Sequence, residues 1–211
     1  MLSRLFLRFG AALLGAAALL AAPVRAADDA PDAMIQRLSN DVLDTIRADK
    51  SLQNGDMSKI IALVDKKIMP SVNFQRMTAS AVGPQWRQAT PEQRQRLQEE
   101  FKTLLVRTYA GALTQVSDQT VAVKPLRASA EDKEVLVRTE VKGRGDPIQL
   151  DYRVEKTPGQ GSGWKIYNLN VMGVWLVETY RSQFAQEITA KGIDGLITLL
   201  VERNKANAKK G

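Results

Sequence analysis

The sequence contains no cysteine and no histidine among its 211 residues. Without thiols there is no disulfide framework and no thiolate nucleophile, and without imidazoles there is no Ser–His or Cys–His catalytic pair. The ligands that define most zinc, haem and iron–sulfur sites are missing as well. Any catalysis would therefore depend on carboxylates, Lys, Tyr, Ser or Thr, and we expect neither a metal nor an organic cofactor.

The first 26 residues have the pattern of a secretory signal peptide. Two arginines precede a continuous run of apolar and small residues from Phe9 to Ala22, and small or β-branched residues surround a cleavage position after Ala26. The alternative, a membrane anchor, needs about 20 apolar residues, more than the run provides. We therefore predict that residues 1–26 are removed and that residues 27–211 form one exported domain, in a periplasm because the chain lacks disulfides.

The formal net charge of +7 suggests a nucleic-acid or anionic-membrane partner only if the charges are concentrated. Removal of residues 1–26 takes away three arginines and no acid, which leaves 27 basic and 23 acidic residues. The segment from about residue 202, which we expect to be a flexible basic tail, holds four of these basic residues and one acid. The body is nearly neutral, so we predict no nucleic-acid partner.

Six stretches of the mature chain have apolar residues at the spacing of an amphipathic helix. They cover residues 32–50, 56–68, 73–82, 90–116, 174–188 and 193–201. The strongest helix start has Thr90 as the N-cap, Pro91 at the first helical position and Gln93 closing a capping box. The helix that begins there is long enough to line a whole domain.

The middle of the chain changes to an apolar period of two. Alternation over residues 121–123, 135–142, 148–155 and 164–171 predicts four half-buried strands. Glycine-containing connections at 143–146 and 158–163 predict hairpins, so the strands form an antiparallel meander. Because helices precede and follow this meander in the sequence, we place the fold in the α+β class.

Carboxylates are the catalytic groups that such a chain retains. Asp151 beside Tyr152 is similar to the Asp base and Tyr donor of small cone-shaped isomerases. Strand alternation places Asp151 on the face opposite to Tyr152, and we therefore predict that Asp151 faces solvent and has no catalytic role.

Several segments, in their order and spacing, resemble the MlaC family, also known as toluene-tolerance or ABC-transporter auxiliary proteins. They are 68–74 (IMPSVNF), 82–94 (VGPQWRQATPEQR), 108–110 (TYA), 164–168 (WKIYN), 173–177 (GVWLV), 180–184 (YRSQF) and 192–197 (GIDGLI). The resemblance covers essentially the whole mature chain. Asn168, Met172 and Trp175 depart from the Asp, Glu and Ser that the family pattern leads us to expect, which puts the local pocket shape or a docking surface in doubt.

The resemblance implies a periplasmic phospholipid carrier in the system that maintains outer-membrane lipid asymmetry. Such a protein holds diacyl lipid tails in an apolar cavity between a four-stranded sheet and helices. The implied partners are an outer-membrane lipoprotein–porin complex and an inner-membrane ABC transporter with an MCE-domain ring, between which a monomeric carrier shuttles. The glycerophospholipid is cargo, and no chemistry on it is implied.

Physical chemistry explains why such a carrier is needed. A lipid with about 30 tail carbons costs on the order of 24 kcal/mol to bring into water, at about 0.8 kcal/mol per CH₂. The apolar faces of the strands and helices supply candidate tail-lining residues, each of which has ordinary core as its alternative role. The candidates are Leu105, Tyr109, Val135, Val137, Leu150, Tyr152, Val154, Leu169, Val171, Val174, Leu176, Tyr180 and Phe184. Arg181 is a candidate for contact with a headgroup phosphate, or else forms a surface ion pair.

Two other functions remain open from the sequence. One is an isomerase- or hydrolase-like enzyme with a cone-shaped fold, which requires a carboxylate inside the pocket; an Asp151 that faces solvent, with no other buried carboxylate, would exclude it. The other is a periplasmic adaptor that binds only proteins, in which the cavity between sheet and helices would be smaller than about 300 Å³.

Overall fold

The structure is a computed structural model that describes residues 30–129 and 131–208. The predicted signal peptide lies outside the described residues. A run of helices is followed by an antiparallel sheet and a last long helix, so the predicted α+β class is confirmed. Among the described residues, no helix combines the length and the apolar character needed to cross a membrane.

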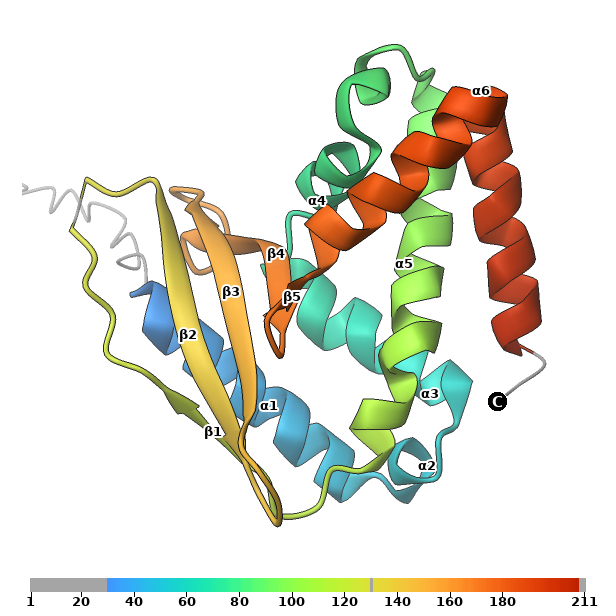
Figure 1. The fold of residues 1–211 in the computed structure, drawn as a ribbon. Coiled ribbons are helices and arrows are strands. Elements are labelled where there is room, and N and C mark those ends of the chain that lie inside the picture. The colour runs from blue at the N-terminus through green and yellow to red at the C-terminus, as the bar shows by residue number, and fades with distance from the viewer. Residues whose placement is uncertain (1–29, 130, 209–211) are drawn as a thin grey trace, which may run out of the picture.

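The first half of the chain is helical (Figure 1). Its α-helices are α1 (Pro31–Ala48), α2 (Lys50–Gln53), α3 (Met57–Leu63), α4 (Phe74–Val82) and α5 (Pro91–Thr114). The predicted helix over 56–68 is wrong in its second half, because the chain continues from α3 as a π-helical turn (Val64–Ile68) and a 3₁₀ turn (Met69–Ser71). A second 3₁₀ turn (Gly83–Arg87) leads to α5.

The predicted start of α5 is confirmed in detail. The hydroxyl of Thr90 accepts a hydrogen bond from the backbone N–H of Gln93, and the side chain of Gln93 accepts one from the N–H of Thr90. Each partner satisfies a backbone donor that the first helical turn leaves open. Leu97, Phe101 and Leu104 follow on the buried face of the helix.

The sheet has five antiparallel strands in chain order. They are β1 (Thr120–Val123), β2 (Glu134–Lys142), β3 (Ile148–Lys156), β4 (Trp164–Val171) and β5 (Val174–Trp175). The prediction of four strands missed β5, which is only two residues long. It joins β4 through a two-residue turn in which Met172 (φ 51°) and Gly173 (φ 88°) both have positive φ, as the tightest hairpins require.

A bulge in β4 decides which side chains share a face of the sheet. Val154 pairs with Ile166, whereas the neighbouring Arg153 pairs with Asn168, so Tyr167 is an extra residue. The bulge keeps the apolar residues on both of its sides on one face. We name the face that carries these apolar residues the inner face. Asn168 and Arg153 lie on the opposite face, which we name the outer face.

The last helix, α6 (Leu176–Ala208), is bent at Gly192, whose φ of 70° interrupts the helical backbone. The two helices predicted on either side of Gly192 are therefore present as the two arms of α6. The helix also continues through residues 202–208, which corrects the flexible tail expected there. Asn204 is only 7% exposed, and its amide donates to the backbone carbonyl and the carboxylate of Glu100 on α5.

Three hydrophobic cores stabilise the fold, and the third joins α1, α2, α3 and α5 through Ile46, Leu52, Ile60, Leu63 and Ala110. The sheet core joins α1 to the inner face of the sheet, and the helical core joins α4, α5 and α6. Figure 1 shows α1 (blue) beside the sheet, and α4, α5 and α6 packed together on the other side of the molecule. The sheet core comprises Met34, Ile35, Val137, Val154, Trp164 and Ile166. The helical core is built around Phe101, Leu97, Tyr180, Phe184, Leu196 and Leu200.

Candidate functional site

The candidate tail-lining residues of the strands lie on the inner face, some in the sheet core and some at its border with the helical core. Tyr152 pairs across the strands with Leu169, and Leu150 pairs with Val171. Tyr152 packs against the sheet core, whereas Leu169 and Val171 pack against the helical core. On β4 itself, Ile166 belongs to the sheet core, so the border between the two cores crosses β4 between Ile166 and Leu169.

Six of the candidates are only partly buried, and five of these lie on α5, β3 and β4. We name them the junction residues: Leu105, Leu150, Tyr152, Leu169 and Val171. Leu105 on α5 packs against the helical core from the side of the helices. Each of the five keeps part of its side chain accessible to solvent.

Other candidates lie deeper. Val137 and Val154 are in the sheet core, and Leu176, Tyr180 and Phe184 are in the helical core. Phe101 meets the rings of Tyr180 and Phe184 edge to face, at centroid distances of 4.9 and 5.2 Å. Such aromatic packing stabilises a filled interior.

The remaining candidates are closer to solvent. Val135 is partly buried beside the sheet core, whereas Tyr109 and Val174 are exposed. Val174 is 52% exposed because it belongs to β5 and not, as predicted, to the start of a helix. Tyr109 lies near Tyr180, and burial raises its phenol pKa above the ordinary value of 10.0.

Tyr152 is the polar member of the junction residues. Burial raises the pKa of its phenol, although hydrogen bonds with the side chains of Ser39 and Thr139 act in the opposite direction. The hydroxyl of Thr139 also donates to the backbone carbonyl of Leu150 at 2.7 Å. Tyr152 therefore remains a neutral phenol near neutral pH and adds no charge to the apolar border.

Arg181 is exposed on α6 and lies over the turn that follows α4. A Cβ atom added at Gly83 would be 3.6 Å from its Nε. Within the described part of the chain, no acid forms an ion pair with Arg181. The structure thus gives no support to the surface ion pair, and contact with a lipid headgroup remains a prediction.

The outer face carries a charged network that the sequence analysis missed. The guanidinium of Arg76 on α4 bonds to Glu155 at 2.5 Å and to Glu134 at 2.6 Å, and it lies 3.6 Å from the ring centroid of Tyr167. The hydroxyl of Tyr167 donates to Glu134 at 2.8 Å. These bonds hold the pKa of Glu134 below its ordinary value of 4.5, with Arg76 as the main cause.

A second outer-face network contains two of the residues that depart from the family pattern. Arg153 lies 4.0 Å from the ring centroid of Trp175 and bonds to Glu178 on α6 at 2.5 Å. The amide of Asn168 donates to Glu178 at 2.7 Å, and its oxygen accepts from the N–H of Leu169. Burial raises the pKa of Glu178, but the bonds from Asn168 and Arg153 outweigh it and lower the pKa overall. Both networks attach the helical layer to the sheet.

Asp151 corrects one of our expectations. It lies on the face opposite to Tyr152, as predicted, but it is only 6% exposed and does not face solvent. Its strand neighbours are Arg138 and Asn170, and Asn170 is itself paired with Trp175 of β5, the strand that the sequence did not predict. Oδ2 accepts from Gln149 at 2.8 Å, whereas Oδ1 has no protein partner among the described residues. The carboxylate is thus buried, but away from the junction residues.

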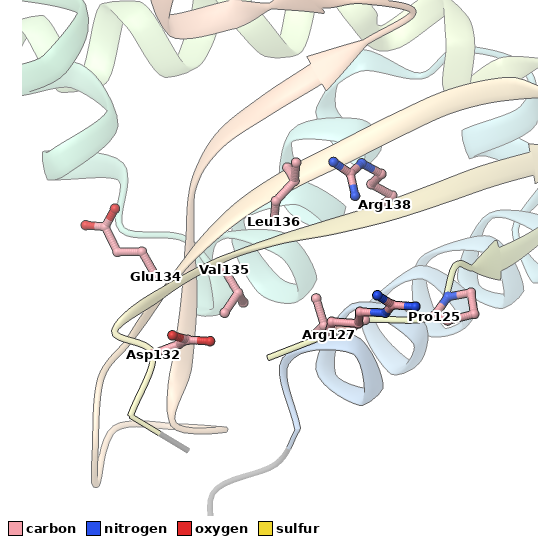
Figure 2. Close-up of a pocket in the computed structure, with 8 residues that line it drawn as sticks. Pro125, Arg127, Asp132, Glu134, Val135, Leu136 and Arg138 are labelled. Atoms are coloured by element: carbon pink, nitrogen blue, oxygen red, sulfur yellow. The ribbon is translucent and has the colours of Figure 1, made fainter. Parts of the chain in front are cut away.

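A pocket of about 460 Å³ lies at the other edge of the sheet (Figure 2). It is lined by Pro125, Leu126, Arg127, Asp132, Glu134, Val135, Leu136 and Arg138. Val135 is the one candidate tail-lining residue among them, so this pocket is not the expected cavity between the sheet and α5. No three acids in the described ranges are grouped in a way that could hold a metal ion.

The sequence and fold can now be compared with those of known proteins. The model of the MlaC protein family matches residues 36–202. This chain belongs to the MlaC family. Its relatives in that family include the toluene tolerance protein ttg2D of Pseudomonas putida, 28% identical over 78% of this chain and 75% of the relative. The intermembrane phospholipid transport system binding protein MlaC of Haemophilus influenzae is 26% identical over 82% of this chain and 81% of its own.

A solved structure has the same fold and a ligand. It is the phospholipid-binding protein of Ralstonia solanacearum in complex with a phospholipid, which is 50% identical to this chain. It superposes with a TM-score of 0.80 over 84% of this chain and 98% of the other. The membership in the MlaC family that the sequence predicted is therefore confirmed, and the Haemophilus and Ralstonia proteins are named for phospholipid transport and phospholipid binding.

Proposed function

We propose that this protein is a periplasmic phospholipid carrier that holds acyl tails along the junction residues, between the sheet core and the helical core. The observation that supports this most directly is the set of partly accessible side chains at the junction, in a chain that is 50% identical to a protein solved with a phospholipid. Leu105, Leu150, Tyr152, Leu169 and Val171 would contact the tails first. The deeper candidates would serve as the walls behind them.

The carrier would exchange lipid with an outer-membrane lipoprotein–porin complex and an inner-membrane ABC transporter with an MCE-domain ring. Release into water would cost on the order of 24 kcal/mol for a lipid with about 30 tail carbons. Transfer therefore has to be coupled to docking on a partner that offers another apolar path. Cleavage after Ala26 would deliver the protein to the periplasm, where such partners meet.

The role we propose is transport without catalysis. An apolar lining favours tails through burial of their surface and provides no group that reacts with an ester or phosphate. Asp151, the acid that suggested an isomerase-like enzyme, lies on the opposite face of the sheet. A cofactor has no role in this account, because the phospholipid itself is the cargo.

Native mass spectrometry of the protein purified from a bacterial periplasm tests this proposal. We expect a co-purified diacyl phospholipid and a mature chain that begins at Ala27. Replacing Val171 with Trp fills the space beside the junction, and lipid occupancy should fall by at least about tenfold, equivalent to about 1.4 kcal/mol. Met172→Trp adds the same side chain at an exposed hairpin position, 70% accessible, and should leave occupancy unchanged.

A lipid-free protein that also takes up no lipid from phospholipid vesicles would refute the carrier and favour the adaptor that binds only proteins. Equal lipid loss in both variants would show that the junction residues are not the binding site. Thermal unfolding of each variant separates loss of lipid from loss of fold.

A further inference from the structure

The pocket at the edge of the sheet contains an unpaired stretch of strand β2. The last residue pair between β1 and β2 is Val123 with Thr139, and the N–H of Lys124 still donates to the carbonyl of Arg138 at 2.9 Å. The next residue, Pro125, has no N–H to donate. From there the chain bows away from β2, as Figure 1 shows to the left of the sheet.

The backbone groups of β2 that face this pocket follow from its register. In an antiparallel pair, alternate residues direct both N–H and C=O to the same neighbour. Arg138 points these groups towards β1, so Leu136 and Glu134 point theirs the same way, into the pocket. Among the described residues, no backbone hydrogen bond joins the segment 125–132 to residues 134–137. On its other edge, β2 is paired with β3 along this whole stretch.

The pocket has an outer wall that is held in place, and its two ends carry opposite charge. Leu126 packs into the sheet core and so holds the bowed segment in place. The guanidinium groups of Arg127 and Arg138 are exposed, and neither forms an ion pair within the described ranges. Figure 2 shows Arg127 on the outer wall, Arg138 on β2, and Asp132 at the end where β2 begins. The pocket is therefore cationic towards β1 and acidic towards the start of β2.

We propose that this edge of β2, from Glu134 to Arg138, binds an extended peptide segment of a partner protein as an added strand. Open N–H and C=O groups in a row are satisfied best by another backbone, which is how sheet edges recognise peptides. The segment would run antiparallel to β2, in the direction of β1, with an acidic residue near Arg138 and a basic residue near Asp132. This site is separate from the proposed lipid site and does not depend on it.

The test uses the ¹⁵N-labelled mature protein and three synthetic hexapeptides. The first, EVTVTK, has the predicted charge order; the second, KVTVTE, has the reverse order; the third is EVTVTK with N-methylated peptide bonds. We expect EVTVTK to slow the hydrogen exchange of the Glu134 and Leu136 amides by at least about tenfold, with a weaker effect of KVTVTE. The N-methylated peptide keeps the side chains but lacks the donors, and it should have no effect.

Two variants complete the test. Leu136→Pro removes an N–H that faces the pocket, a position where a strand edge tolerates proline, and it should abolish protection of Glu134. If that variant does not fold, Arg138→Glu serves instead. It should weaken the protection that EVTVTK gives to the Glu134 and Leu136 amides and strengthen the protection that KVTVTE gives. Arg144→Glu, at the β2–β3 hairpin outside the pocket, is the matched control. It should leave the protection by both peptides unchanged.

Three results would overturn the proposal. The first is that the N-methylated peptide binds as tightly as EVTVTK. The second is that EVTVTK protects other amides but not those of Glu134 and Leu136. The third is that inorganic phosphate alone shifts the same resonances as much as EVTVTK does. The last would show a simple anion site at the two arginines.

Discussion

The helical core and the sheet core, two of the three hydrophobic cores, differ in their residue types and in how exposed the side chains beside them are. The helical core has an aromatic centre in which Phe101 and Phe184 are fully buried. The sheet core is aliphatic apart from Met34 and Trp164, and its inner-face neighbours along β3 and β4 become partly exposed where the helical layer begins. This contrast supports our proposal that lipid tails lie at the border, whereas the helical core contributes chiefly to stability.

The largest expected effect of a substitution is in the helical core. Phe184→Ala removes a fully buried ring that contacts Phe101, and we expect the free energy of unfolding to fall by about 3–5 kcal/mol. Urea denaturation of the delipidated protein measures this. Leu169→Ala at the junction should cost less than about 2 kcal/mol, because part of the side chain is already exposed. Equal losses would mean that the border is as well filled as the helical core.

The attachment of α6 to α5 should give the next largest effect. Asn204→Ala removes the hydrogen bonds that the buried amide donates to Glu100, and we expect a loss of about 1–3 kcal/mol. Asn207→Ala, one turn further along the same helix, is the control. If Asn204→Ala were neutral, the end of α6 would not contribute to stability and would behave as the tail that the sequence suggested.

The outer-face networks should contribute less, since the carboxylate of Glu134 is half exposed. Arg76→Ala should lower the free energy of unfolding by about 1–2 kcal/mol after allowance for solvent screening. The folded pKa of Glu134 lies below its ordinary value of 4.5. Its contribution is therefore complete above about that pH and is lost as the pH falls through the lower, folded value.

Unfolding measured as a function of pH tests this sign. The wild-type protein should lose more stability on acidification below pH 4.5 than Arg76→Ala does, since the variant has already lost the partner of Glu134. Parallel pH profiles of the two proteins would contradict the assignment.

The smallest expected effect is at the β4–β5 turn, where Met172 has a φ of 51°. Asparagine adopts positive φ at lower cost than methionine, so Met172→Asn should stabilise the protein by about 0.5–1 kcal/mol, measured as a rise in the unfolding midpoint. A drop would show that the exposed methionine side chain contributes contacts that outweigh its backbone strain.

The sequence predicted the parts of the fold that depend on local periodicity. The helix start at Thr90, the β2–β3 hairpin and the inner-face position of Leu150 and Tyr152 all followed from spacing and turn residues. It did not predict β5, because two residues form no period. It misplaced the solvent exposure of Asp151 for a related reason, since alternation tells which face a residue is on and not what covers that face.

Long-range contacts limited the prediction of the candidate site in the same way. All the candidate tail-lining residues were chosen as positions on the predicted apolar faces, and only packing divides them into core residues and the accessible junction. The Arg76 network joins α4 to residues some 60 to 80 positions away in the chain, and no local pattern points to such a pairing. The burial of Asn204 likewise depends on Glu100, which lies on another helix.

The central claim is that acyl tails lie along the junction residues. The most direct measurement is of nuclear Overhauser effects between the acyl protons of a bound diacyl phospholipid and the methyl groups of the isotope-labelled protein. We predict contacts from the acyl chains to the methyl groups of Leu105, Leu150, Leu169 and Val171. Contacts confined to other surfaces, such as the pocket beside β2, or an absence of contacts in a lipid-loaded sample, would contradict this account.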